Sequence, residues 1–248
     1  MWTRRDIKSK AWENLRSSYW KAFLVSLVIA IVGGNGGSGF NGSSGSSPSG
    51  FPGGGGGDVF SPELIAFIII AVCVGVLIFF AFRIFVGYPL EVGGRKYFIE
   101  AEQLRYDMNY LGYIFNKERY LDVVKSMFWR AFINFLWYLL LIIPGIIASY
   151  AYRMVPYILA DNPNIGYKRA LELSTQMTNG HKWGTFVLDL SFIGWMLLGI
   201  LALLIGVLFV FPYINATNAE LYLILRQNAL DNGLCSREEL SLVPPVEL

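Results

Sequence analysis

Five polar residues stand within or beside apolar segments of the chain, where a side chain needs a chemical or structural reason to occur. They are Arg83, Arg153, Asp189, Asn215 and Glu220. Ionisable groups at membrane depth are costly, so the four charged residues are candidates for a substrate or ion site. Arg153 and Asp189 lie in successive apolar runs, which predicts an ion pair between two helices. Two structural alternatives remain: the pair only fixes helix register, and Arg83 extends its side chain to the membrane surface.

Asn215 is followed by two further polar residues, Thr217 and Asn218, in the last apolar run. Such a group lines a polar cavity in some membrane proteins. In others it forms hydrogen bonds that hold neighbouring helices together. Both interpretations stay open from the sequence.

The sequence lacks the residue sets that enzymes and metal sites use. It has a single histidine, His181, and two cysteines, Cys73 and Cys235, that are far apart. No His-Glu-x-x-His or Gly-x-Ser-x-Gly motif is present, and the five glycines at 53–57 follow no strand. We therefore expect no enzyme activity, no cofactor and no metal.

Transmembrane helices must position the polar residues. Hydrophobic residues make up 54% of the 248 and charged residues only 15%, against about 25% charged in a soluble domain. Apolar runs cover 22–32, 62–90, 128–160 and 183–225. These features predict an all-α, multi-pass transmembrane helical bundle that forms a single integral membrane domain over 1–248.

The two longest apolar runs are long enough to fold back on themselves, since about 20 residues cross a bilayer. Turns at Pro144-Gly145 and near Gly206 would give about six spans in three hairpins. All basic residues then lie in cytoplasmic segments or within helices, as the positive-inside rule predicts. Because the topology accounts for them, they do not indicate binding to nucleic acid. If each run crossed once instead, Lys168 would lie outside.

The ends of the chain and its glycine-rich segment complete this topology. Residues 1–21 have the pattern of a cytoplasmic amphipathic helix at the membrane interface, although the short apolar run after them also resembles the core of a signal peptide. Residues 33–61 are expected to be an extracytoplasmic Gly/Ser-rich loop. Residues 91–125 are expected to be a polar cytoplasmic segment, and residues 226–248 a cytoplasmic tail.

A weak internal repeat marks the three predicted hairpins. Interfacial anchors are expected at Trp20, Trp129 and Trp183, each where an amphipathic segment becomes apolar. Helix kinks are expected at Pro89, Pro156 and Pro212, each of which is followed by an acidic residue.

Two stretches resemble a known family. They are Val155-Pro156-Tyr157-Ile158-Leu159-Ala160-Asp161-Asn162-Pro163, and Leu188-Asp189-Leu190-Ser191-Phe192-Ile193-Gly194-Trp195 leading to Phe211-Pro212-Tyr213-Ile214-Asn215-Ala216-Thr217. They are similar to a bacterial integral membrane family known only as domain of unknown function 975. The resemblance implies a multi-pass protein of the bacterial cytoplasmic membrane. It implies no catalytic residue, because the family has no settled activity.

Two functions are compatible with these features. The first is a non-catalytic scaffold or accessory protein in envelope maintenance, peptide export or antimicrobial-peptide tolerance, with both termini cytoplasmic. The alternative is a small transporter or permease with a site near Arg153 and Asp189. The expected partner is the lipid bilayer, with anionic headgroups contacting a basic helix at 164–177 on the cytoplasmic face. The sequence identifies no protein partner.

Overall fold

The computed structural model describes residues 2–32, 62–201 and 205–242, and the elements in these ranges are all helical, as predicted. They are α1 Arg4–Arg16, α2 Tyr19–Ile31, α3 Pro62–Phe82, the π-helix η2 Arg83–Gly87, α4 Tyr88–Ala101, the 3₁₀ helix η3 Met108–Gly112, α5 Lys117–Leu140, α6 Ile142–Ala151, α7 Val155–Asp161, α8 Tyr167–Thr178, α9 Lys182–Leu201 and α10 Ile205–Asp231. The predicted Gly/Ser-rich loop at 33–61 lies outside the described residues.

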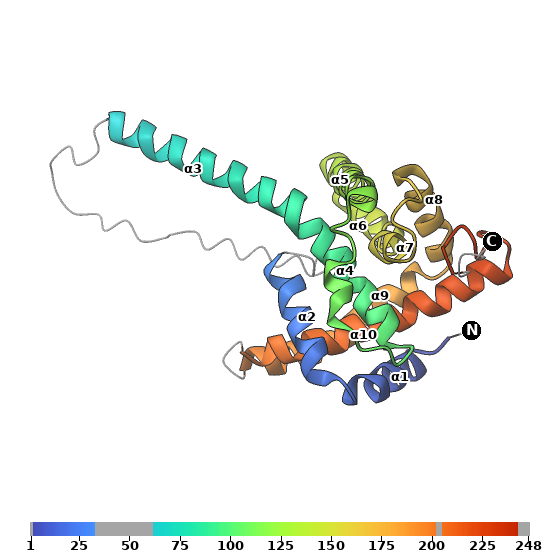
Figure 1. Cartoon of the computed structure of the whole chain (residues 1–248). Helices are drawn as coiled ribbons and strands as arrows, with labels where there is room; N and C mark the ends of the chain where they lie inside the picture. Colours follow the sequence, from blue (N-terminus) through green and yellow to red (C-terminus); the bar gives the residue numbers. More distant parts are fainter. Residues whose placement is uncertain (1, 33–61, 202–204, 243–248) are drawn as a thin grey trace.

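Helices α4 and α10 form the centre of the bundle. Helix α4 contacts α2, α5, α7 and α10, and α10 also packs against α1, α2, α8 and α9 (Figure 1). Eleven of the fourteen residues of α4 are buried. The core is therefore built around a helix that carries the charged residues Glu91, Arg95 and Glu100.

Four helical stretches in the described part of the chain are long and apolar enough to cross a membrane. They are Ala66–Ala101, Ile142–Asp161, Lys182–Ile200 and Gly206–Asp231. Helix α2 is also apolar but has only 13 residues. The helices thus support a membrane protein, as the composition predicted.

Helix α3 projects away from the rest of the bundle (Figure 1). No residue in its most apolar stretch is buried inside the protein, and side chains such as Phe67 and Leu77 are 69% exposed. Exposing so many large apolar side chains to water would be strongly unfavourable. This surface is suited to the hydrocarbon of a bilayer.

The segment after Pro89 corrects the predicted boundary of the polar region. Residues 91–101 of the predicted polar segment continue the helix of the first long apolar run and are largely buried. The charged residues of this segment made it look polar in the sequence. In the fold, Glu91 pairs with Arg83, and Arg95 donates to Asn215 of α10.

The three prolines have different effects on their helices. Pro89 lies in the first turn of α4, directly after the π-helix, and Pro156 lies in the first turn of α7. Pro156 stands at a helix junction, where the missing N–H costs no hydrogen bond. Pro89 lies in a helix that runs on from the π-turn, and the Tyr120 hydroxyl donates to the Phe85 carbonyl, four residues before the proline, at 2.6 Å. Pro212 instead lies within the continuous helix α10.

The chain reverses direction in both of the longest apolar runs. The first reversal is at Leu141, whose extended backbone separates α5 from α6, and not at Pro144-Gly145, which belongs to α6. Gly145 packs so tightly on Tyr138 that an added Cβ would lie 2.9 Å from the tyrosine Cα. In the second run, a Cβ on Gly199 would lie 2.7 Å from the backbone nitrogen of Val207.

The amphipathic helices pack their apolar faces on the protein itself. Ile7, Ala11 and Leu15 of α1 are buried, and the helix ends at Arg16 before α2 begins at Tyr19. The apolar face of α8 is buried as well. Its contacts are with α5, α6, α7 and α10, so little of that face remains for lipid.

The predicted tryptophan anchors differ in exposure. Trp20 and Trp183 are 70% and 74% exposed at the beginnings of α2 and α9. Trp129 lies in the middle of α5 and stacks on Tyr167, with ring centroids 5.6 Å apart.

Candidate functional site

Arg153 and Asp189 form the predicted ion pair. Arg153 lies in the short break between α6 and α7, and Asp189 lies in α9. Arg153 Nη1 donates to Asp189 Oδ2 at 2.6 Å, and Nη2 donates to Oδ1 at 2.7 Å. This bidentate geometry, with two parallel N–H···O hydrogen bonds, is among the strongest arrangements of an arginine and a carboxylate.

Two further side chains complete this cluster. The Tyr150 hydroxyl donates to Asp189 Oδ2 at 2.9 Å, and Arg153 Nη2 donates to Asn218 Oδ1 of α10 at 2.8 Å. The side chains of Arg153 and Asp189 are only 1% and 14% exposed. The cluster therefore ties the α6–α7 junction to α9 and α10 through charge-assisted hydrogen bonds.

Asn215 belongs to a second cluster, around Arg95 of α4. Arg95 Nη1 donates to Asn215 Oδ1 at 2.6 Å, and Asn215 Nδ2 donates to the Ser26 hydroxyl of α2 at 3.0 Å. The Arg95 guanidinium also lies over the Tyr157 ring, 5.2 Å from its centroid. Asn215 thus joins three helices, as the hydrogen-bonding alternative predicted.

Arg83 belongs to a third cluster, with Glu91 and Arg130. The π-helix carries Arg83, whose Nη2 lies 2.9 Å from Glu91 Oε2. Arg130 of α5 approaches the other carboxylate oxygen at 3.8 Å. Glu91 is nearly fully buried and is flanked by both guanidinium groups.

Glu220 belongs to a fourth cluster, where the N-terminal helix meets the core. Lys10 of α1 lies 2.5 Å from Glu220 Oε1, while Glu220 Oε2 is buried without a hydrogen-bond partner among the described residues. Nearby, Asn14 Nδ2 donates to Glu102 Oε2 at 2.5 Å. Burial raises the pKa of Glu102 to about 8, although the hydrogen bond from Asn14 opposes that shift.

A fifth cluster, around Asp161, was not among the predicted site residues. Asp161 accepts hydrogen bonds from Arg226 at 2.7 Å and from the Tyr222 hydroxyl at 2.8 Å, and Lys96 Nζ lies 3.5 Å away. Its sequence signal was its place at the end of the proline-bearing helix α7. Arg95 was missed because it lies in the segment that was predicted to be polar and cytoplasmic, outside the apolar runs.

The structure therefore brings together only Arg153 and Asp189 among the five predicted residues. The other three lie in separate clusters with partners of their own. Within the described ranges, no group of three or more His, Cys, Asp or Glu side chains is arranged to hold a metal ion. The clusters link helices and do not converge on one reaction centre.

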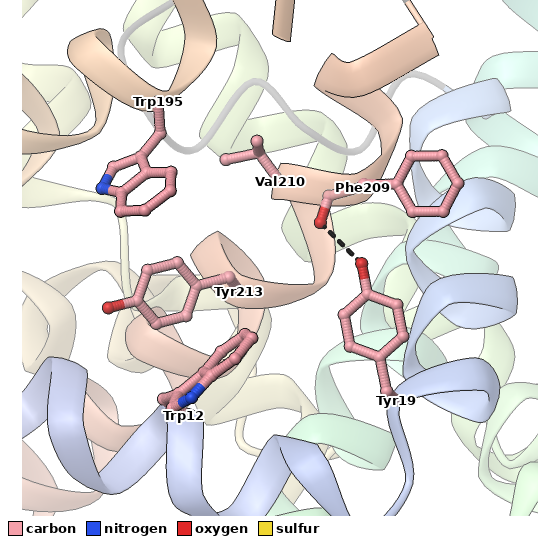
Figure 2. A pocket seen from close by; sticks show the side chains of 6 residues that line it. All are labelled: Trp12, Tyr19, Trp195, Phe209, Val210 and Tyr213. Carbon is pink, nitrogen blue, oxygen red and sulfur yellow. Dashed lines mark hydrogen bonds between the residues drawn. The ribbon is translucent and has the colours of Figure 1, made fainter. Parts of the chain in front are cut away.

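Two of the cavities that the described residues form lie between several helices, outside the Arg153–Asp189 cluster. An aromatic pocket of about 490 Å³ lies between α1, α2, α9 and α10, and Figure 2 shows the six side chains that line it. They are Trp12, Tyr19, Trp195, Phe209, Val210 and Tyr213. The Tyr19 hydroxyl donates to the Phe209 carbonyl across it at 2.9 Å (Figure 2).

The second cavity is a groove of about 700 Å³ between α3, η2, α4 and α5. Its walls include phenylalanines of α3 and α5, and Arg83, Glu91, Arg130 and Asn134 also line it. Neither cavity is lined by Arg153 or Asp189.

Comparison with known proteins gives one match. Residues 58–229 match the model of a family described as "Protein of unknown function (DUF975)". No curated protein and no solved structure matches the chain.

Proposed function

This chain belongs to the DUF975 family of proteins of unknown function, and we propose that it is a non-catalytic scaffold or accessory protein of the bacterial cytoplasmic membrane. Its role in this proposal is in envelope maintenance, peptide export or antimicrobial-peptide tolerance. The reasons are the way in which its core charges are used and the surfaces that it presents.

The observation that carries the proposal is the closed Arg153–Asp189 cluster. Arg153 Nη1 and Nη2 each donate a hydrogen bond to a carboxylate oxygen of Asp189, and the arginine side chain is 1% exposed. A substrate site in a permease needs groups that can exchange their partners for a ligand. Buried pairs that satisfy each other serve register and specificity instead.

The proposed topology has six spans in three hairpins, with both termini in the cytoplasm. The chain reversals at Leu141 and between Gly199 and Val207 favour two of these hairpins. In Figure 1 the first residues of α3 and α10 lie at the left, whereas the start of α1 and the end of α10 lie at the right. This separation is what the proposed topology requires.

A permease is the second candidate, and one observation favours it. The α6–α7 helix is interrupted directly beside Arg153, and interrupted helices frame the substrate sites of many transporters. In that case the charges of Arg153 and Asp189 would be needed for function and not only for folding.

The test uses a strain that lacks the gene and is challenged with a cationic antimicrobial peptide. The strain is complemented with the wild type or with the double variant Arg153→Met/Asp189→Leu, which replaces the charged pair by apolar side chains. For a scaffold, the double variant should restore survival to the wild-type level whenever it reaches wild-type amounts in the membrane.

Two results would contradict the proposal. A double variant that accumulates normally and melts like the wild type but fails to restore survival would favour the permease. A deletion strain as resistant as its parent to the peptide and to other envelope stress would exclude the envelope role.

A further inference from the structure

The groove between α3 and α5 is polar at one end and aromatic elsewhere. Arg83 directly follows the apolar helix α3, and Arg130 lies near the start of the apolar part of α5. Phe79 lies one turn before Arg83, and Phe132 and Phe135 follow Arg130, so they lie toward the apolar parts of both helices. The two guanidinium groups thus lie where the apolar parts of α3 and α5 end.

Among the described residues that line the groove, the charges at the polar end are unbalanced. Two guanidinium groups, of Arg83 and Arg130, face one carboxylate, of Glu91. Glu91 lies closer to Arg83, at 2.9 Å, than to Arg130, at 3.8 Å. One net positive charge therefore remains on the groove lining, and it is associated with Arg130.

Arg130 and Asn134 have hydrogen-bonding capacity that the described residues leave unused. Within the described part of the chain, the Arg130 guanidinium lies near the distant Glu91 oxygen and donates to the Met127 sulfur at 3.9 Å, which is a weak acceptor. Asn134 lies one helical turn further along α5, and its Oδ1 atom is buried without a partner. Both side chains line the groove. An arginine and an amide in this state fit a ligand with several oxygen atoms.

We propose that this groove binds an anionic phospholipid, with the phosphodiester on Arg130, the polar glycerol region near Asn134, and an acyl chain against the phenylalanines. A phosphodiester carries the single negative charge that the lining lacks. A free phosphate would make no use of the aromatic walls, whereas a phospholipid fills both parts of the groove. Basic pockets between transmembrane helices bind lipid headgroups in this way. The site goes beyond the proposed function, because it suits a scaffold and a permease equally.

The experiment counts bound lipids on the purified full-length chain by native mass spectrometry. Phosphatidylglycerol and phosphatidylcholine with identical acyl chains are compared for the wild type, Arg130→Gln and Arg119→Gln. Arg119 is the matched control because it is a half-buried arginine of the same helix and lies outside the groove lining, with its guanidinium over the Tyr113 ring. Each charge-assisted hydrogen bond to the phosphate contributes about a tenfold preference.

We expect the wild type and Arg119→Gln to prefer phosphatidylglycerol by about tenfold, and Arg130→Gln to lose this preference. Asn134→Leu removes an unpaired amide without changing the charge. It should fold even if Arg130→Gln does not, and it should bind phosphatidylglycerol more weakly than the wild type. Equal binding of both lipids by the wild type would overturn the proposal, as would equal losses in the two arginine variants.

Inorganic phosphate is added as a competitor to separate a lipid site from a simple anion site. At millimolar concentrations it should leave phosphatidylglycerol in place, because the acyl chain contributes to the binding of the lipid alone. Displacement by phosphate would show an anion site and would refute the assignment to a lipid.

Discussion

Replacing Asp189 by leucine should be among the most damaging single changes in the core. The substitution removes both acceptors of the two short bonds from Arg153 and leaves that guanidinium 1% exposed with only Asn218 as a hydrogen-bond partner among the described residues. Removing one partner of a buried pair costs about 3–5 kcal/mol. We expect Asp189→Leu to fall at the upper end of this range.

Arg153→Met should cost less, although it breaks the same pair. The carboxylate left behind is 14% exposed and still accepts the hydrogen bond from Tyr150. We therefore expect a loss near the lower end, about 3 kcal/mol. The double variant should be more stable than Asp189→Leu alone, because apolar side chains of suitable volume can replace a buried pair at little cost.

The assay is thermal unfolding of the purified protein in mild detergent, followed by intrinsic tryptophan fluorescence. For a chain of this size, 3–5 kcal/mol corresponds to a fall in Tm of roughly 6–20 °C. The double-variant cycle then isolates the interaction between the two side chains. Losses that simply add in the double variant, or a smaller loss for Asp189→Leu than for Arg153→Met, would refute the description of the cluster as a closed, mutually dependent pair.

Three other predictions test the N-terminal contact, a helix crossing and the topology. The folded-state pKa of Glu102 is about 8, above its ordinary value of 4.5, so the stability that its protonation contributes is complete below pH 4.5 and is lost as pH rises through 8. Tm should therefore fall between about pH 4.5 and pH 8 in the wild type, and much less in Glu102→Gln. Gly199→Ala should lose about 1–3 kcal/mol in chemical unfolding because its Cβ would meet backbone of α10, whereas Gly194→Ala, with open space around it, should be neutral or slightly stabilising. The topology is tested in intact cells with single-cysteine variants of a protein from which Cys73 and Cys235 have been removed. A membrane-impermeant thiol reagent should label Leu141→Cys but not Lys168→Cys. Labelling of Lys168→Cys would exclude the three-hairpin topology.

The sequence alone predicted an all-helical protein with helices that can span a membrane, and it predicted the ion pair between Arg153 and Asp189. Apolar runs of more than 20 residues leave few alternatives to membrane helices, because an unpaired backbone cannot be accommodated in hydrocarbon. Arg153 and Asp189 were predictable as a pair because an isolated charge in an apolar segment needs an opposite charge. The family was also recognisable from the proline-bearing stretches.

Sequence patterns could not place the partners of the other polar residues. Asn215 contacts Arg95 and Ser26 across 120 and 189 residues of chain, and no periodicity encodes such distances. The exact point of chain reversal was also missed: Pro144 is tolerated near the start of α6, while Leu141 adopts the extended conformation that ends α5.

Helix α4 shows most clearly what only the tertiary structure decided. Its charged residues gave it the appearance of an exposed segment, because hydropathy treats each charge as if it were solvated. In the folded protein Glu91 and Glu100 are buried beside basic residues that are near in the sequence, Arg83 and Arg105. Arg95 instead donates to Asn215 of α10, and Arg130 of α5 approaches Glu91 at 3.8 Å. A charge is compatible with a buried helix once its partners are in place, and the packing of α5 and α10 against α4 supplies these two distant partners.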